Sequence, residues 1–342
     1  MRATISRIAH EAGVSTATVD RVLNDREGVR VKTRDRVIEV ANRLGYFGGG
    51  SRAMVGDVRM DFILPAGSNS FMVALGRHLL AEAQARPQVR AQLHLIDGFD
   101  ADTLAWKLYE LGSSTDAIGL VGLDHPQVRE AIAAVQAGGV PVSTLVSDIP
   151  ASGRVGYVGI DNRAAGRLAG LLLGRFLGGG REGHEVAVFA GSLAYRGHEE
   201  REMGFRSLLG EEFPQLQMSR IVEVSDDREL AYEAASELLR GRPPVAIYNI
   251  GAGNQGIARA LQEAGLDQRV VFIGHELTDS SRRLLLDRVM DAVIDQNPRV
   301  EAREIVKLLV SAVRKVPEPS YMPRLQVIFR ENIPTGYGTG PA

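Results

Sequence analysis

The chain has 342 residues, of which 44% are hydrophobic, and it carries 40 Lys or Arg against 42 Asp or Glu. That length exceeds one average domain, and the apolar content supports a large core. The absence of cysteine excludes disulfides, thiolate zinc sites and cysteine nucleophiles.

The N-terminal stretch does not read as a signal peptide, because Arg7, His10 and Glu11 interrupt its apolar residues. No later segment approaches the length of a membrane span. We therefore expect a soluble, cytoplasmic protein that does not bind membranes. Residues 1–47 hold 9 Lys or Arg against 6 Asp or Glu. A basic head on a mildly acidic body suits a module that contacts phosphates.

Residues 4–24 predict two short helices joined by a sharp turn. Thr4 and Ser15 are typical N-caps of these helices, and Gly13 suits a left-handed turn between them. A third helix near Lys32–Leu44 is expected to close a small core. The apolar side chains expected in that core are Ile5, Ile8, Ala9, Ala12, Val19, Val22, Leu23, Val37, Ala41, Leu44 and Tyr46.

The second helix would present a separate face, formed at steps of three and four by Thr16, Ala17, Asp20, Arg21 and Asn24. This arrangement is a helix-turn-helix, whose second helix enters the major groove of DNA. A three-helix bundle without a nucleic-acid role shares the apolar pattern. The glycine turn with two matched caps is much rarer, so DNA binding is the favoured interpretation.

After the Gly48–Gly50 run, strands and helices alternate to the end of the chain. Such alternation predicts parallel sheets with helices on both faces, and about ten strands are too many for one small sheet. Because the series divides near Gly156–Asn162, we expect two doubly wound lobes. A cleft between them would bind a ligand beyond the carboxyl ends of the strands. The expected strands are Val58–Leu64, Ala91–Ile96, Ala117–Gly122, Val140–Leu145, Tyr157–Ile160, Glu185–Phe189, Arg220–Val224, Val245–Ile250, Val270–Ile273, Ala292–Ile294 and Arg324–Phe329.

The loop Gly251–Gly256 fits the pattern G-x-G-x-x-G, follows a predicted strand and opens a predicted helix. Glu276 stands 20 residues further on, where a dinucleotide site places the acid that binds a ribose hydroxyl. An NAD-dependent oxidoreductase is therefore one alternative. Against it, the motif lies deep in the second lobe, whereas the first strand-to-helix turn is its usual place.

The head resembles that of the LacI/GalR family of bacterial transcription regulators, and the match is dense. In the body the resemblance is looser and extends to the periplasmic-binding-protein type of effector domain, most like its ribose-binding branch. The matching residues are Ile8-Ala9, Ala12-Gly13-Val14-Ser15, Thr18-Val19, Arg21-Val22-Leu23-Asn24, Val31, Thr33-Arg34, Val37 and Leu44-Gly45-Tyr46 in the head, and Asp161-Asn162, Gly166, Gly204-Phe205, the glycine loop and Asp295-Gln296 in the body.

The resemblance implies a small all-α three-helix head, followed by an α/β body of two doubly wound parallel-sheet lobes. We expect a DNA-binding head at residues 1–47, a glycine-rich hinge or linker at 48–56, and a two-lobed effector-binding and dimerisation domain at 57–342. The residues implied in DNA binding are Thr16, Ala17 and Arg21 on base edges, and Thr4, Ser15 and Asn24 at the phosphates.

Two positions depart from the family pattern. Asp20 stands where the family usually has a small neutral residue, and a carboxylate there would orient Arg21 or accept from a cytosine amine. The run Gly48–Gly50 replaces the usual start of a short hinge helix, and each glycine costs such a helix about 1 kcal/mol relative to Ala. Residues Ser51–Val55 could still form one turn, with Met54 or Val55 as the wedge between base steps. A plain linker is the alternative.

Sugar sites combine flat aromatic side chains with planar polar groups that pair with adjacent hydroxyls. By resemblance, Asn69 is a hydroxyl ligand, Phe71 is a stacking wall, and Arg201 and Glu276 pair with hydroxyls, although the family more often has Asp in place of Glu276. Gln296 matches a glutamine that bridges the lobes. Ser147 and Asn249 end predicted strands and are further candidates.

Each candidate has a structural alternative. Phe71 could be a core residue at a helix start, and Arg201 a solvated helix arginine. Ser147 could belong to a simple crossover loop, and Asn249 could satisfy backbone groups. Gln296 could lie at a hinge crossing without touching a ligand.

We expect a DNA-binding transcription regulator, most often a repressor in this family, which acts as a homodimer on a pseudo-palindromic double-stranded operator. Its effector would be a monosaccharide, polyol or sugar acid. We predict no catalytic residue, cofactor or metal site. A sugar-binding protein without a regulatory role remains an alternative, although it would need an export signal.

Overall fold

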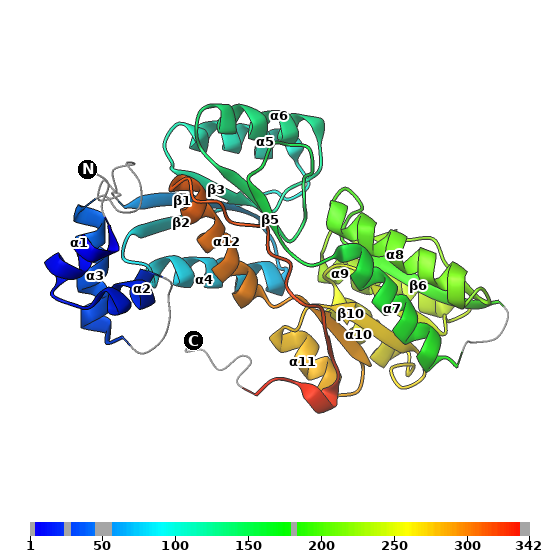
Figure 1. The fold of residues 1–342 in the computed structure, drawn as a ribbon. Helices are drawn as coiled ribbons and strands as arrows, with labels where there is room; N and C mark the ends of the chain where they lie inside the picture. The colour runs from blue at the N-terminus through cyan, green and yellow to red at the C-terminus, as the bar shows by residue number, and fades with distance from the viewer. Residues whose placement is uncertain (1–3, 24–28, 45–56, 179–182, 336–342) are drawn as a thin grey trace. The chain divides into compact units, whose positions relative to one another are not determined.

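The computed structural model describes residues 4–23, 29–44, 57–178 and 183–335 (Figure 1). The chain forms two compact units, Met1–Gly56 and Asp57–Ala342, which we call the head and the body. Several residues of the sequence-based predictions lie outside the described ranges. They are Asn24, Gly45, Tyr46, Gly48–Gly50, Met54, Val55 and the rest of the 48–56 hinge.

The head contains three helices in its described residues, α1 (Ile5–Ala12), α2 (Thr16–Leu23) and α3 (Val31–Arg43). Their apolar faces meet in one core, as the spacing of apolar residues predicts. Ile5 and Leu44 pack at its margin. The buried members are Ile8, Ala9, Ala12, Val19, Val22, Val37, Val40 and Ala41.

The angle between α1 and α2 is set by the predicted caps and turn. Thr4 caps α1 by accepting from the Arg7 N–H at 3.4 Å, and Ser15 caps α2 by accepting from the Thr18 N–H at 3.1 Å. Gly13 ends α1 with a φ of 67°, in the left-handed region that favours glycine. These three residues confirm the local geometry that the sequence predicts.

The first lobe of the body is built on a five-stranded parallel sheet in the order β2-β1-β3-β4-β5. Helices α5 and α6 cover one face and α4 and α12 the other (Figure 1). The elements of lobe 1 are β1 (Val58–Pro65), α4 (Ser70–Gln84), β2 (Val89–Ile96), α5 (Ala101–Gly112), β3 (Ala117–Leu120), α6 (Pro126–Ala137), β4 (Val142–Leu145), β5 (Gly156–Val158) and α12 (Pro298–Val313).

The second lobe has a sheet in the order β12-β11-β10-β9-β6-β7, with β8 also paired to β6. One core cluster lies between this sheet and α7 and α8, and another lies beneath α9, α10 and α11. The elements of lobe 2 are α7 (Asn162–Phe176), β6 (His184–Ala190), α8 (Arg196–Glu212), β7 (Leu216–Met218), β8 (Val222–Glu223), α9 (Arg228–Arg240), β9 (Ala246–Asn249), α10 (Asn254–Glu263), β10 (Val271–His275), α11 (Asp279–Leu286), β11 (Ala292–Asp295), β12 (Gln326–Ile328) and the 3₁₀ turn η1 (Arg330–Asn332).

One strand departs from the parallel pattern that the alternation predicts. Strand β12 pairs antiparallel with β11, with Val293 opposite Ile328. The reason is the path of the chain, because α12 packs on lobe 1 and the chain then returns to the edge of the lobe 2 sheet from the opposite direction. Strand β7 and the turn η1 are also absent from the sequence-based prediction, and each contains only three residues.

Within the described body the chain passes between the lobes from β5 to α7, from β11 to α12, and from α12 to β12. Two of these segments lie side by side, since the Gly159 N–H donates to the Tyr321 carbonyl at 3.3 Å. The lobes are therefore joined along one side, and a cleft opens between the carboxyl ends of their strands. None of the helices in the described ranges has the length and apolar character needed to cross a bilayer.

Candidate functional site

The outward face of α2 is the first candidate site. Thr16, Ala17 and Arg21 are exposed, whereas Val19 and Val22 on the opposite face are buried in the head core. The helix therefore presents the predicted side chains to solvent. Asp20 is half-buried on the same helix.

Thr4 and Ser15 are exposed at the N-termini of α1 and α2. Free backbone N–H groups and the positive end of the helix dipole favour an anion at such a position. Both hydroxyls already accept one backbone N–H, and the Ser15 Oγ also lies 2.9 Å from the Thr18 hydroxyl. Both predicted phosphate residues therefore lie exposed at helix N-termini.

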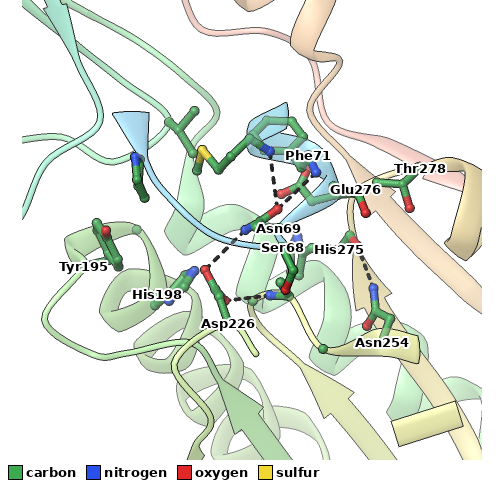
Figure 2. A pocket seen from close by; sticks show the side chains of 18 of the residues that line it. Ser68, Asn69, Phe71, Tyr195, His198, Asp226, Asn254, His275, Glu276 and Thr278 are labelled. Carbon is green, nitrogen blue, oxygen red and sulfur yellow. Dashed lines mark hydrogen bonds between the residues drawn. The ribbon is translucent and has the colours of Figure 1, made fainter. Parts of the chain in front are cut away.

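The second candidate site is the cleft of the body, with about 890 Å³ of space when its open mouth is included. Both lobes contribute to its lining (Figure 2). Of the predicted ligand residues, Asn69, Phe71, Ser147, Arg201 and Glu276 line the cleft.

Asn69 joins the two walls of the cleft. Its Oδ1 caps α4 by accepting from the N–H groups of Phe71 and Met72, at 3.0 and 3.3 Å. Its amide donates to Oδ2 of Asp226 in lobe 2, at 3.2 Å (Figure 2). Phe71, in the first turn of α4, is only 3% exposed, so it belongs to the core and to the cleft wall together.

Arg201 is fixed at the base of the cleft by the packing of α7 against α8. A Cβ on Gly166 of α7 would lie 1.8 Å from the Arg201 carbonyl oxygen, so only glycine permits this close approach. The guanidinium is 3% exposed. Its Nε donates to Asn162 Oδ1 at 2.7 Å and its Nη1 to the Ile250 carbonyl at 2.8 Å.

Glu276 follows β10 and has a φ of 69°, a conformation that costs energy for a non-glycine residue. Its Oε1 accepts from the Gln296 amide at 2.6 Å and lies 3.5 Å from Arg201 Nη2. Burial raises the pKa of this carboxyl to about 8, because the ionised form loses its water; Arg201 opposes the rise and Asp295 adds to it.

The two remaining candidates, Asn249 and Gln296, lie behind the lining residues. Asn249 is fully buried and donates to the Gly251 carbonyl at 3.1 Å and to Asn254 Oδ1 at 2.7 Å. Gln296 is 1% exposed and donates a hydrogen bond to Glu276, which lines the cleft. Both are placed to support residues of the cleft wall.

Several lining residues were not among the predicted ligands, notably Asp226, His198 and His275. Asp226 directly follows the loop after β8, and its Oδ1 accepts from the Ala252 N–H at 2.8 Å. Burial lowers the pKa of both histidines, so each favours the neutral form. The position of Asp226 just after the expected strand Arg220–Val224 was the available signal.

Other contacts cross the mouth of the cleft. The Tyr195 hydroxyl donates to the Gly98 carbonyl at 2.6 Å, and the Tyr195 ring meets Phe99 edge-on at 5.6 Å. The Gly197 N–H donates to Ser147 Oγ at 3.3 Å. With the bond between Asn69 and Asp226, these contacts hold the lobes in a closed arrangement.

The glycines of the Gly251–Gly256 loop have internal reasons to be glycine. A Cβ on Gly256 would lie 1.9 Å from the Arg228 carbonyl oxygen, which is where α10 packs against α9. A Cβ on Gly251 would lie 2.5 Å from Asp226 Oδ1. The dinucleotide-like pattern is therefore accounted for by packing and by the placement of Asp226.

Comparisons with known proteins match both parts of the chain. The family described as bacterial regulatory proteins, lacI family, matches residues 4–47, and the periplasmic binding protein domain matches residues 60–315. Catabolite control protein A of Priestia megaterium is 26% identical over 286 residues, which cover 78% of this chain and 80% of that protein. The transcriptional regulator DegA of Bacillus subtilis is 26% identical over 256 residues, covering 72% and 73%.

Solved structures share the fold of the body. A glucose-galactose binding protein from Geobacillus stearothermophilus has a TM-score of 0.72 and 24% identity, covering 81% of this chain and 99% of that one. A solute-binding protein from Burkholderia graminis, solved with D-arabinose, has a TM-score of 0.76 and 21% identity, covering 83% and 98%. The chain therefore belongs to the lacI family of bacterial regulatory proteins, as a DNA-binding transcription regulator with a periplasmic-binding-protein body.

Proposed function

We propose that this protein is a repressor whose affinity for its operator is controlled by a small sugar-like effector bound in the cleft. The observation that carries the proposal is the presence, in one chain, of an outward α2 face and a polar cleft that joins two lobes. A DNA-binding module alone needs no such cleft, and an exported sugar-binding protein needs no such head.

On the DNA side, Thr16, Ala17 and Arg21 contact base edges in the major groove. Thr4, Ser15 and Asn24 contact or frame the phosphates, and Met54 or Val55 acts as a minor-groove wedge if the hinge forms a helical turn. Two chains pair through their bodies about a two-fold axis, so that two heads read a pseudo-palindromic operator. The exposure of Thr16, Ala17 and Arg21 supports this assignment.

On the effector side, Asn69, Phe71, Ser147, Arg201 and Glu276 form the ligand-binding wall, and Asn249 and Gln296 hold it in place. The combination of an aromatic wall with amide, hydroxyl and carboxyl groups is typical of sites for polyhydroxylated compounds. Solved relatives of similar fold are described as binding glucose and galactose, D-arabinose and D-allose, which supports the same class here.

Effector binding stabilises the closed cleft and changes how the lobes sit, and that change alters operator affinity. Couplings of this kind are typically about 1–3 kcal/mol, or about 5- to 150-fold in affinity. Because linkage is reciprocal, operator DNA changes effector affinity by the same factor.

The test begins by selecting DNA that binds the full-length protein from a pool of random duplexes. We expect an enriched pseudo-palindrome, whose affinity then changes when a bound sugar or polyol is added. Enrichment of no sequence would contradict the operator assignment. An operator affinity that stays constant at saturating effector would contradict the regulatory role.

A further inference from the structure

The buried polar atoms around Glu276 are short of hydrogen-bond donors. Three buried oxygens there have no partner within the described residues, namely Oε2 of Glu276, Oε1 of Gln296 and Oδ1 of Asn249. A buried acceptor left unpaired is unfavourable, because it has lost its water without gaining a donor. Within the described residues, the Nδ1 of His275 also has no partner. The other ring nitrogen, Nε2, pairs with the Tyr248 hydroxyl at 2.8 Å, so the tautomer of the ring decides whether Nδ1 donates or accepts.

The one buried cation at this point already has its partners. Arg201 directs its guanidinium to the Asn162 side chain, the Ile250 carbonyl and the Glu276 carboxyl, and none of its nitrogens is left without a partner. An effector carboxylate would have to displace Glu276 from Arg201. It would leave the Glu276 carboxyl without its cation in a buried site.

Lobe 2 contributes two acidic side chains to the lining of the cleft. Glu276 and Asp226 both line it, and both have a left-handed backbone, with φ values of 69° and 54°. Such costly conformations persist where the surrounding structure requires them, and they cluster at functional sites. The other lining arginine, Arg228, is exposed and lies 3.5 Å from Glu229, so its charge is partly balanced outside the cleft.

Resting on the proposed function, we infer that the cleft takes an uncharged effector rich in hydroxyl donors and excludes compounds that carry a carboxylate or a phosphate. Hydroxyl groups of such an effector donate to Glu276 Oε2. Within the proposed class, this selects sugars and polyols and removes sugar acids.

The raised pKa of Glu276, about 8, points the same way. Burial removes water from the ionised carboxylate, and hydroxyl donors from an effector would replace that water. An anionic effector would instead place a second negative charge beside the carboxylate, which repels it.

The experiment measures binding to the full-length protein for compounds matched in carbon skeleton. The probes are D-glucose, D-galactose and D-arabinose, each compared with its polyol, its sugar acid and its terminal phosphate, first by thermal shift and then by calorimetry. We expect at least one uncharged compound to bind, and its acid and phosphate to bind at least about 100-fold more weakly.

The possible failures differ. If an acid or a phosphate binds as tightly as its uncharged counterpart, this inference is overturned, and the proposed function stands. If none of the probes binds, the sugar-like effector of the proposed function is contradicted, and the inference fails with it.

Two variants test the residues that carry the inference. Glu276→Gln keeps the shape of the side chain but removes its charge, so the discrimination against the matched acid should fall at least about tenfold. Glu237→Gln, an exposed residue of α9, makes the same change in net charge away from the cleft and should leave the discrimination unchanged. Should Glu276→Gln fail to fold, Asp226→Asn, at the other acidic side chain that lines the cleft, replaces it. Unchanged discrimination in the folded cleft variant overturns the inference.

Discussion

Arg21 is the longest polar side chain on the exposed part of α2, and it alone there offers a planar set of donors. An arginine that bonds two acceptors of one guanine distinguishes that base from the others. We expect Arg21→Ala to weaken operator binding by roughly 1–3 kcal/mol and to flatten the preference among operator variants. Fluorescence anisotropy with operator and with random duplex measures both effects.

Arg240→Ala is the matched control, since Arg240 is an exposed arginine at the end of α9 and its loss changes the net charge equally. It should leave the ratio of operator to random affinity as it is. If Arg21→Ala weakens both kinds of DNA by the same factor, Arg21 contacts only the backbone.

Glu276 gives effector binding a pH dependence. Arg201, Asp295, Gln296 and Glu301 face its carboxyl, whose pKa burial raises to about 8. Effector hydroxyls favour the ionised form, so binding lowers this pKa and releases a proton. The affinity for an uncharged effector should therefore rise with pH up to about 8 and then level off.

Calorimetry in buffers of different ionisation enthalpy measures the released proton directly. Glu276→Gln should remove both the proton release and the pH slope. An affinity that falls as the pH rises toward 8 would show that the effector prefers the protonated carboxyl.

The residues of the cleft show which parts of a site a sequence can reveal. Asn69 and Glu276 follow strands of five residues or more, and their positions were predictable from that pattern. Asp226 also follows an expected strand, Arg220–Val224, within which β8 lies, so the same positional signal was present in the sequence for Asp226. Asn249 and Gln296 lie one layer behind the cleft wall. That placement depends on side-chain packing between distant segments, which local sequence patterns do not contain.

At the scale of elements, the contact between α7 and α8 positions the base of the cleft. Gly166→Ala would place a Cβ 1.8 Å from the Arg201 carbonyl oxygen, so the helices must separate. We expect a loss of about 1–3 kcal/mol in the free energy of unfolding, together with weaker effector binding because Arg201 shifts. Chemical denaturation and calorimetry measure the two effects.

Gly210→Ala provides the control on the same helix, because a Cβ there meets no atom within 4 Å. Alanine at an open helical position stabilises by roughly 0.5–1 kcal/mol relative to glycine. If both substitutions act alike, close packing is not the reason for Gly166.

Helix α12 carries a buried carboxyl at its start. Glu301 is 0% exposed, and among the described residues neither of its oxygens has a hydrogen-bond partner. Burial raises the pKa of this carboxyl well above its ordinary value; Glu276 and Asp295 add to the rise, Arg201 opposes it, and Tyr157 lies nearby. The folded protein therefore holds a proton that the unfolded chain gives up above about pH 4.5.

The proton on Glu301 stabilises the folded protein fully below the pKa that Glu301 has in the unfolded chain. This stabilisation is lost as the pH rises through the pKa that Glu301 has in the folded protein. Glu301→Gln is uncharged at every pH, so it should melt at a higher temperature than the parent at alkaline pH and at nearly the same temperature in acid. Each 1 kcal/mol corresponds to about 2–4 °C in Tm. Glu237→Gln controls for net charge, and a parent-like melting curve of Glu301→Gln at alkaline pH would contradict the prediction.

The elements also differ in how far the sequence determines them. Helix α12 begins at Pro298 for local reasons, because the Asn297 side chain caps it and Pro298 suits its first position. Strand β12 was expected near its place, but its antiparallel direction depends on where α12 packs. Direction in a sheet is a property of the chain path, which the local apolar pattern does not encode.

At the scale of the whole molecule, the two candidate sites lie in different units of the chain. The head carries the outward face of α2, and the body carries a cleft whose two walls are bonded through Asn69 and Asp226 and through Tyr195 and Gly98. Under the proposed function, effector contacts would add to these bonds and favour closure, and operator affinity would change in response. Both functions must therefore be measured on the full-length chain.

The measurement that tests this account most directly is operator affinity with and without a saturating uncharged effector, for the parent protein and for Arg201→Ala. The account predicts a change of about 5- to 150-fold for the parent. For Arg201→Ala it predicts the same operator affinity as the parent without effector, and no change in that affinity when effector is added, provided that the variant melts as a folded protein. An operator affinity of the parent that is the same with the cleft empty and filled would contradict it, as would a normal effector response from the folded Arg201→Ala variant.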